Sequence, residues 1–253
     1  MKRVTFKPGD LEQCAAFAYF DVVAARARFP EYDVEMIDRF ETQVLVVRSD
    51  DYLVFAFRGT EAHKLKDILT DINILRTPTD WGKVHTGFHR ALEHAWPQIW
   101  YHVQRAAGRR ILITGHSMGG DLAVLLAARL VRNKVRPSRV VTFGMARVGS
   151  PEFAEKYNAE LGNITDRVVV KSDPIALVPL PFRFRHVGRL HWWTGKRWRN
   201  KTNWLRWSIV TARVGAKWLW AIVRKRKWST PLFRHHGMIN SYIKTLEETG
   251  TTF

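Results

Sequence analysis

The stretch Gly115-His116-Ser117-Met118-Gly119-Gly120 decides how this chain folds. Residues 110–114 before it carry three consecutive Ile or Leu residues, which predicts a buried strand, and residues 121–131 after it predict a helix. A serine between two glycines at such a junction lies on a crowded, strained turn, where the neighbouring glycines leave room for the backbone. The turn lifts the hydroxyl above the sheet, so we predict that Ser117 is a nucleophile. The alternative is a tight strand-to-helix turn with an incidental serine.

Strand and helix patterns alternate on both sides of this turn. Strands are expected at residues 42–48, 52–58, 110–114, 139–143 and 166–171. Helices are expected at residues 10–28, 92–107, 118–133, 151–161 and 237–248, with Asp10 and Gln13 as a capping box for the first. The alternation predicts one α/β domain over residues 1–253, with a mostly parallel, doubly wound sheet. A serine turn in this context resembles the nucleophile elbow of the α/β-hydrolase fold.

Composition narrows the class of protein further. The hydrophobic content of 46% is ordinary for a globular protein, and the single cysteine, Cys14, excludes an intramolecular disulfide. No apolar run follows the basic start of the chain, so we expect no secretory signal. No uncharged apolar run reaches 18 residues, so we expect no conventional membrane span. These patterns favour a cytoplasmic location, with peripheral attachment to a membrane as an extension of it.

Acyl transfer from an ester needs a base and an acid besides the nucleophile, and on this fold the acid and then the histidine follow the serine. Asp173 comes directly after a predicted strand, at the edge of the sheet where catalytic acids lie. Asp166 begins the same strand and therefore lies at the opposite edge. Asp121 lies one turn into the elbow helix, where we expect it to interact with the helix dipole and point away from the site. The sequence therefore favours Asp173 as the acid.

The base must come later in the chain than the acid. His186 and His191 lie in an aromatic, basic stretch that we expect to form a β-hairpin surface. His235 and His236 lie just before the last predicted helix, where a loop can return a ring to the elbow. We favour His236, and His235 stays open. No metal or cofactor is implied by this chemistry.

Several ordered motifs resemble those of one known family. They are residues 54–60 (VFAFRGT), 84–88 (VHTGF), 115–120 (GHSMGG), 142–149 (TFGMARVG), 173–179 (DPIALVP), and His236-Gly237-Met238 with Tyr242. In this order they resemble the class 3, fungal-type lipases of the α/β-hydrolase fold. The resemblance covers roughly residues 44–181 and the last twenty residues. Met118 and Met145 depart mildly from the family pattern, and Tyr242 lies one residue further from His236 than the pattern has it.

The resemblance implies further site residues. It places the oxyanion donors on the backbone N–H and hydroxyl of Thr60 and on the backbone N–H of Met118. The second donor is also expected because Met118 begins a helix, where the first N–H groups lack partners in the helix. The resemblance makes residues 61–74 a lid, and its apolar residues share one helical face: Leu65, Ile68, Leu69 and Ile72. A fixed amphipathic helix packed on the core is the alternative.

The positive charge is concentrated in one part of the chain. The formal net charge is +18, yet residues 1–173 carry 25 Lys or Arg against 21 Asp or Glu. Residues 174–246 carry 16 Lys or Arg, no acidic residue, and eight of the eleven tryptophans. We interpret residues 182–234 as a basic, aromatic-rich insertion in the hydrolase domain.

Helical spacing in this insertion predicts a broad apolar surface with a narrow cationic stripe. The candidate membrane-contact residues are Arg206, Trp207, Arg213, Lys217, Trp218, Trp220 and Arg224. This pattern is typical of a helix lying in an anionic membrane interface. Nucleic-acid binding by phosphate contacts and stacking is one alternative, and an insertion packed on the protein's own core is another.

Together these patterns predict a serine lipase or esterase that hydrolyses acylglycerol or phospholipid esters, with phospholipase A1 activity included, at a membrane surface. A soluble short-chain carboxylesterase is the nearest alternative. A hydrolase-like module that acts mainly in membrane or nucleic-acid attachment is the alternative from another class. The sequence does not determine the oligomeric state.

Overall fold

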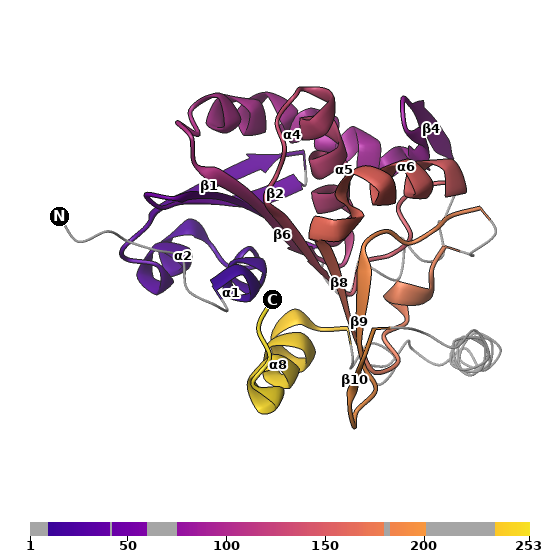
Figure 1. The fold of residues 1–253 in the computed structure, drawn as a ribbon. Helices are drawn as coiled ribbons and strands as arrows, with labels where there is room; N and C mark the ends of the chain where they lie inside the picture. The colour runs from indigo at the N-terminus through magenta and orange to yellow at the C-terminus, as the bar shows by residue number, and fades with distance from the viewer. Residues whose placement is uncertain (1–9, 41, 60–74, 180–182, 201–235) are drawn as a thin grey trace.

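The computed structural model describes residues 10–40, 42–59, 75–179, 183–200 and 236–253. An eight-stranded sheet forms its centre, in the order β1-β2-β3-β6-β7-β8-β9-β10 (Figure 1). The strands are β1 (Asp33–Arg39), β2 (Thr42–Arg48), β3 (Tyr52–Phe57), β6 (Arg110–His116), β7 (Arg139–Phe143), β8 (Thr165–Val170), β9 (Arg189–Trp193) and β10 (Trp198–Arg199). A separate hairpin pairs β4 (Arg76–Thr79) with β5 (Gly82–His85).

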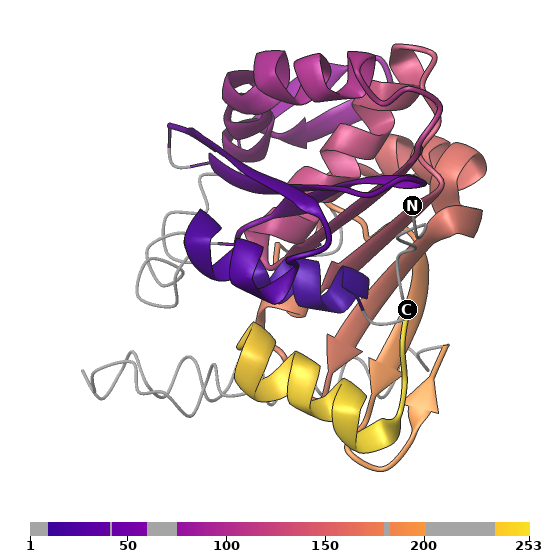
Figure 2. The ribbon, with the colours of Figure 1, turned by 90° about the vertical axis from the view of Figure 1, so that its left-hand side faces the viewer.

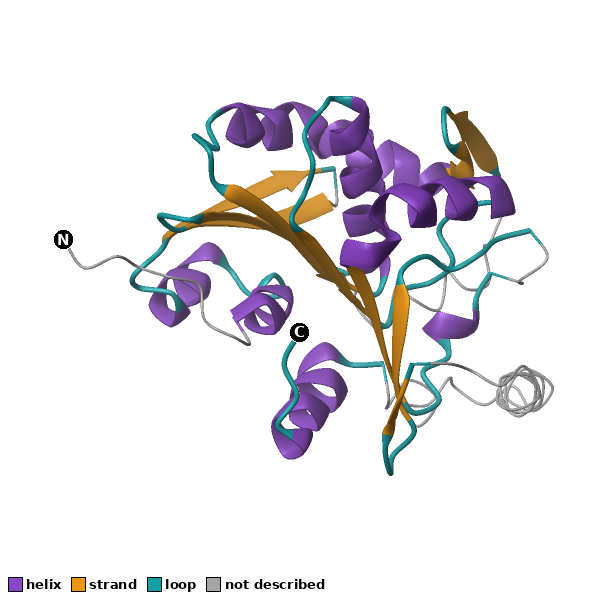
Figure 3. Cartoon of the chain, viewed as in Figure 1, coloured by secondary structure: helices purple, strands orange, loops and turns teal. Residues whose placement is uncertain are grey.

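The middle of the sheet is parallel, as predicted. β3, β6, β7, β8 and β9 run in the same direction, whereas β1, β2 and β10 pair antiparallel at the margins (Figure 3). The carboxyl ends of the five parallel strands therefore meet at one edge. Side chains in the loops that leave this edge converge although they are far apart in sequence.

Helices cover both faces of the sheet (Figures 1 and 2). On one face lie α1 (Asp10–Phe17), α2 (Val22–Arg28) and α8 (Lys244–Thr249), and on the other lie α4 (Thr86–Gln104), α5 (Met118–Arg132) and α6 (Pro151–Leu161). Two separate buried apolar clusters correspond to the two faces. The chain is therefore a three-layer α/β/α domain.

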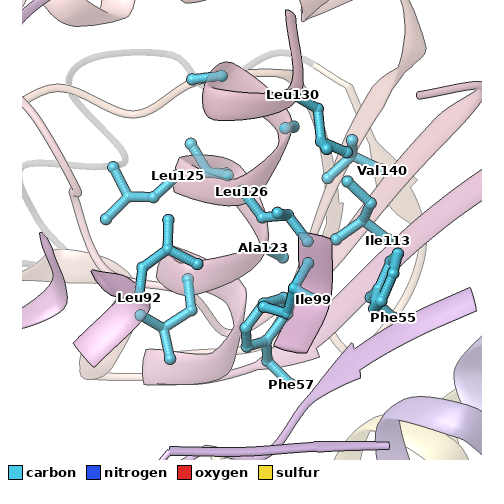
Figure 4. Packing of buried hydrophobic residues seen from close by; sticks show 14 of the residues in the cluster. Phe55, Phe57, Leu92, Ile99, Ile113, Ala123, Leu125, Leu126, Leu130 and Val140 are labelled. Atoms are coloured by element: carbon cyan, nitrogen blue, oxygen red, sulfur yellow. The ribbon is translucent and has the colours of Figure 1, made fainter. Parts of the chain in front are cut away.

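The elbow helix α5 is the most deeply buried helix of the larger cluster. Leu122, Ala123, Val124 and Leu126 are fully buried on it. Figure 4 shows Ala123 and Leu126 facing the strand residues Phe55, Phe57, Ile113 and Val140, while Leu92 and Ile99 come from α4. A helix that is apolar on most sides must be enclosed by other elements, so the core itself fixes the axis of α5 and the position of the turn before it.

The structure corrects the predicted helix over residues 10–28. It is two helices, α1 and α2, with a break at residues 18–21. The Asp21 carboxylate accepts a 2.8 Å hydrogen bond from the Ala24 backbone N–H and caps α2, because aspartate supports a new helix start better than the helix interior. Apolar residues keep helical spacing across the break, so the sequence pattern predicted one helix instead of two.

Other boundaries also differ. The predicted helix over residues 92–107 begins earlier, at Thr86, and ends at Gln104. β1 and the β4–β5 hairpin were not predicted. The burial of β1 alternates only in part, and the hairpin strands are only four residues long, so neither gives a strong pattern.

The predicted helix over residues 237–248 has two parts. Met238–Ile243 form a π-helical turn, and α8 continues from Lys244 to Thr249. The Tyr242 backbone N–H donates to the Gly237 carbonyl oxygen at 3.3 Å, a bond across five residues that defines the wider turn.

Several predictions lie outside the described residues. The predicted lid at residues 61–74 is one of them. Of the predicted insertion at residues 182–234, residues 183–200 contain β9 and β10, and all of the membrane-contact candidates lie beyond the described part. Among the helices that the structure describes, none has the length and apolar character needed to cross a bilayer.

Candidate active site

The elbow has the strained geometry that the sequence predicts. Ser117 has φ 58° and ψ −131°, directly before the first residue of α5. A Cβ added to Gly115 would collide with the backbone of Gly119, and one added to Gly119 would collide with the Phe57 carbonyl. The Ser117 backbone N–H donates to the Phe143 carbonyl oxygen at 2.9 Å, which fixes the turn against the end of β7. A non-glycine residue at positive φ costs free energy that the surrounding packing must offset.

The carboxylate of Asp173 and the ring of His236 form a buried pair. His236 Nδ1 lies 3.0 and 2.9 Å from the two Asp173 carboxylate oxygens, and both side chains are almost completely buried. An ionised carboxylate only accepts hydrogen bonds, so Nδ1 carries the proton. In the neutral ring Nε2 is then an acceptor, ready to take a proton from a nucleophile.

Three donors hold the Asp173 carboxylate. Besides His236, the Tyr242 hydroxyl donates to Oδ2 at 2.5 Å and the Ile175 backbone N–H donates to Oδ1 at 2.9 Å. Burial and the neighbouring Asp173 charge raise the pKa of the Tyr242 hydroxyl, which keeps it a donor. The π-helical turn accommodates the extra residue between His236 and Tyr242 and still brings the hydroxyl to the carboxylate.

The reacting atoms of the proposed nucleophile and base lack hydrogen-bond partners within the described part of the chain. Among the described residues, neither Ser117 Oγ nor His236 Nε2 has a hydrogen-bond partner, and both atoms are buried. The His236 ring lies against the ring of His116, the residue before Ser117, with ring centroids 4.6 Å apart. Catalytic hydrogen bonds are often long in the absence of substrate and tighten when it binds.

The remaining oxyanion candidates are placed in part. Met118 is the first residue of α5, whereas Thr60 and His235 lie outside the described residues. Gly59, just before Thr60, is described. A Cβ added to it would lie 3.0 Å from Ser117 Cβ, so Gly59 lies directly beside the nucleophile.

The other acids and histidines that the sequence raised serve elsewhere. Asp166 is buried at the start of β8 and pairs with Arg139, Arg189 and His191 at 2.8 to 3.0 Å. The expected opposite-edge position of Asp166 is therefore confirmed, and its contacts are an ion-pair network.

His191 lies on β9, which pairs with β10 in a hairpin, as expected. His186 does not lie on that hairpin, because β9 begins only at Arg189. The ring Nε2 of His186 donates to the Ala176 carbonyl oxygen at 2.8 Å. Burial raises the pKa of Asp121 well above its usual value, which favours the neutral acid over the charged group that a helix dipole attracts.

Two residues near the site were not singled out as functional by sequence reasoning. The Tyr19 hydroxyl lies 2.6 Å from His116 Nδ1, and His116 Nε2 lies 2.5 Å from the His236 carbonyl oxygen. The sequence could have indicated His116 as a site residue, because His116 is part of the elbow motif. No sequence pattern indicates Tyr19, because it lies in the break between α1 and α2, and the helical spacing of the sequence does not reveal this break.

No group of three or more His, Cys, Asp or Glu side chains in the described part of the chain is arranged to hold a metal ion. The groups that the structure places at the site are a serine hydroxyl, an imidazole, a carboxylate and backbone N–H groups.

Comparisons with known proteins agree with this geometry. The family model described as Lipase (class 3) matches residues 54–182, about half of the chain. A lipase of Rhizopus niveus is 32% identical over 167 residues, which cover 60% of this chain and 42% of that protein. The secreted mono- and diacylglycerol lipase 1 of Fusarium solani is 35% identical over 117 residues, covering 44% of this chain and 34% of that protein. The chain thus spans less than half the length of these two relatives.

Solved structures show the same fold. Lipase II from Rhizopus niveus superposes with a TM-score of 0.60 at 27% identity, over 72% of this chain and 77% of that chain. The triacylglyceride lipase of Rhizomucor miehei superposes with a TM-score of 0.63 at 23% identity, over 73% of this chain and 77% of that chain. With the family match over residues 54–182, these likenesses show that the chain belongs to the class 3 lipase family and has the α/β-hydrolase fold.

Proposed function

We propose that this protein is a serine hydrolase that cleaves acyl ester bonds of lipids through Ser117, His236 and Asp173. The observation that carries the proposal is the buried His236–Asp173 pair beside the elbow, whose acceptor nitrogen Nε2 has no partner among the residues that the structure describes. A buried imidazole that is fixed by a carboxylate at one nitrogen and bare at the other is arranged to accept a proton.

The reaction has two steps in this proposal. His236 Nε2 takes the Ser117 proton while Oγ attacks the ester carbonyl, and the alcohol leaves with that proton. Water then attacks the acyl–Ser117 intermediate, and His236 again takes and returns the proton. Asp173 stabilises the imidazolium, and the backbone N–H groups of Thr60 and Met118, with the Thr60 hydroxyl, hold the oxyanion.

The proposed substrates are acylglycerols. This is supported by the relatives, one of which is named a mono- and diacylglycerol lipase and another a triacylglyceride lipase. Phospholipids carry the same acyl ester bonds. A phospholipase A1 releases the sn-1 acyl chain of a phospholipid, and the ester panel below distinguishes this activity from acylglycerol hydrolysis.

The nucleophile is tested by replacing Ser117. We expect Ser117→Ala to lower the turnover of p-nitrophenyl butyrate by about 10⁴-fold or more, because only binding and the oxyanion donors remain. Ser150→Ala is the matched control, since Ser150 is also a buried serine before a helix, and it caps α6. The control should keep turnover within about twofold, since the cap contributes to stability. Wild-type turnover in Ser117→Ala would remove Ser117 from the mechanism.

The substrate class is tested with an ester panel. Triolein emulsion, phosphatidylcholine vesicles and soluble p-nitrophenyl acetate are compared at equal ester concentration. We expect kcat/KM to be highest for triolein. Preference for the soluble acetate, with no rise of rate above the solubility limit of longer esters, would make the protein a carboxylesterase. Preference for the phospholipid, with release of the sn-1 acyl chain, would make it a phospholipase A1.

We further propose that the basic segment attaches the protein peripherally to anionic membranes on the cytoplasmic side. Residues 174–246 carry 16 basic and no acidic residues with eight tryptophans, a composition suited to lipid phosphates and headgroup-level rings. Flotation with phosphatidylglycerol vesicles should exceed flotation with phosphatidylcholine vesicles and weaken as salt rises. Fractionation of cells that express the tagged chain tests the location.

A charge-matched pair of variants tests the segment itself. Replacing Arg206, Arg213, Lys217 and Arg224 with glutamine should abolish flotation. The control replaces four exposed cations elsewhere with glutamine: Lys83, Lys134, Arg136 and Lys156. Equal loss in both variants would show that only net charge matters. Tighter binding to a single-stranded oligonucleotide than to vesicles would favour nucleic acid as the partner.

A further inference from the structure

His116 links the proposed nucleophile to the proposed base. It is covalently attached to Ser117, and its ring packs against the His236 ring at 4.6 Å between centroids. Its Nε2 lies 2.5 Å from the carbonyl oxygen of His236 itself, so the contact holds the backbone of the base and not its ring. His116 is almost completely buried, and both of its ring nitrogens have partners.

The partners of His116 determine its protonation. A carbonyl oxygen only accepts, so the proton is on Nε2, which donates to His236. Burial first, and then the neighbouring His236, lower the pKa of His116 well below its usual value, so the ring is neutral. Nδ1 is therefore a bare acceptor, and the Tyr19 hydroxyl must be the donor in the 2.6 Å contact.

Tyr19 joins this network to the other side of the nucleophile. Burial raises the pKa of its hydroxyl, which stays protonated, and the Gly59 backbone N–H faces the same oxygen. A Cβ at Gly59 would overlap the Tyr19 hydroxyl and the His116 carbonyl oxygen, so the Gly59 backbone, the His116 backbone and the Tyr19 side chain meet without spare room. The Tyr19 ring also lies 5.7 Å from the Arg58 guanidinium carbon.

We propose that Tyr19 and His116 are positioning residues, which fix His236 at its backbone while Asp173 fixes it at its ring. One anchor leaves the ring free to pivot about the Nδ1–carboxylate contact, whereas two anchors set the direction of Nε2. The hydroxyl of Tyr19 selects the His116 tautomer that makes the second anchor. This inference rests on the proposed function of Ser117 and His236, and neither Tyr19 nor His116 touches the reacting atoms.

Removal of the Tyr19 hydroxyl is the first test. We expect Tyr19→Phe to lower kcat for p-nitrophenyl butyrate about tenfold with KM within about twofold, because orientation of the base is impaired and substrate binding is not. Tyr157→Phe is the matched control. Tyr157 is fully buried, whereas Tyr19 is partly buried, and the Tyr157 hydroxyl lies 3.0 Å from the Thr165 hydroxyl, at the opposite edge of the sheet. It should keep kcat within about twofold at a similar loss of thermal stability.

A donor-specific pair tests His116. His116→Phe keeps a ring against His236 but has no N–H, and should lower kcat about 30-fold. His116→Gln places an amide N–H near the position of Nε2 and should recover kcat to within about threefold of wild type. The rate at which a fluorophosphonate labels Ser117 should follow the same order in all of these variants.

The outcomes separate this inference from the proposed function. A wild-type kcat in both Tyr19→Phe and His116→Phe, with Ser117→Ala inactive, would overturn the positioning role and leave the proposed function standing. Equal losses in His116→Gln and His116→Phe would also overturn it, because the loss would then follow packing and not the N–H donor.

If Ser117→Ala is fully active, the proposed function fails first. The ring ¹⁵N spectrum of Ser117→Ala then still tests the network, which requires the Nε2–H tautomer at His116 at pH 7; an Nδ1–H tautomer would contradict it.

Discussion

Two buried aspartates at the ends of β8 show how position on the sheet separates roles. Asp173 follows the strand at its carboxyl end and contacts His236, whereas Asp166 lies at its start and contacts His191. Each is a buried carboxylate beside a histidine, so local chemistry alone does not distinguish them. The direction of the strand does, because only its carboxyl end faces the elbow.

Replacing Asp173 should therefore impair mainly catalysis, whereas replacing Asp166 should impair mainly stability. Asp173→Asn should lower kcat by about 10³-fold or more, since the amide no longer stabilises the imidazolium that forms. Asp166→Asn should lower the free energy of unfolding by about 1–3 kcal/mol, through its buried ion pairs, with kcat within about twofold. Ester kinetics and urea titrations of both variants measure this. A kcat loss in Asp166→Asn as large as in Asp173→Asn would contradict the assignment.

Two glycines near the site differ in the space around them. A Cβ at Gly59 would overlap the Tyr19 hydroxyl and the His116 carbonyl, whereas one at Gly237 would meet nothing within 4 Å. Gly59→Ala should lower the free energy of unfolding by about 1–3 kcal/mol and displace Ser117 and residue 60, with loss of turnover. Gly237→Ala, next to His236, should remain active. Equal activity of the two variants would refute this account of the packing.

Much of the site could be predicted from single residues. Ser117, Asp173 and His236 each lie in a motif or at an element boundary that sequence alone reveals, and the structure brings Asp173 and His236 together. Tyr19 could not be predicted. Its contact with His116 joins residues 97 positions apart, and no local pattern encodes such a distance.

At the scale of elements, short irregularities deliver the side chains that surround the base. The break between α1 and α2 presents Tyr19, and the π-helical turn presents Tyr242. Both lie in segments that the sequence predicts as one regular helix. Periodicity reports which face is buried, and it remains nearly unchanged when one residue is added or a helix restarts.

The regular elements, by contrast, were predicted well. β2, β3, β6, β7, β8, α5 and α6 lie where the sequence predicts them, within two residues at each end. These are the elements with continuous apolar runs or clear caps. β1 and the β4–β5 hairpin lack both, and for that reason they were missed.

The packing of α5 gives a prediction at this scale. Leu126 is fully buried in the cluster between α5, α4 and the sheet, whereas Leu75 is 62% exposed. Leu126→Ala should lower the free energy of unfolding by about 2–5 kcal/mol, because a cavity opens behind the elbow. Leu75→Ala should change it by about 0.5 kcal/mol or less. Urea denaturation measures both. A small effect at Leu126 would mean that the core collapses around the deletion.

At the scale of the whole molecule, histidines with lowered pKa values make stability depend on pH. Burial lowers the pKa of four histidines: His85, His102, His116 and His186. Below about pH 6.5 the unfolded chain therefore binds more protons than the folded one, and stability falls as pH falls. Burial raises the pKa of Asp121 and Glu12, which acts in the opposite direction, but these are two groups against four.

The free energy of unfolding should thus rise between about pH 5 and pH 7, by up to ~1.4 kcal/mol per pH unit for each histidine that stays neutral. Urea titrations across this range measure the slope. His102→Gln should reduce the slope, whereas His94→Gln, at an exposed position on the same helix α4, should leave it unchanged. A stability that is flat, or that rises toward pH 5, would contradict the prediction.

Capture of the acyl intermediate tests the central claim most directly. The protein is quenched in acid during turnover of p-nitrophenyl butyrate, and its tryptic peptides are weighed. The account predicts a butyryl adduct on the peptide of residues 111–129, localised to Ser117 and absent from Ser117→Ala. Steady turnover with no adduct there, or with the acyl group on another residue, would contradict it.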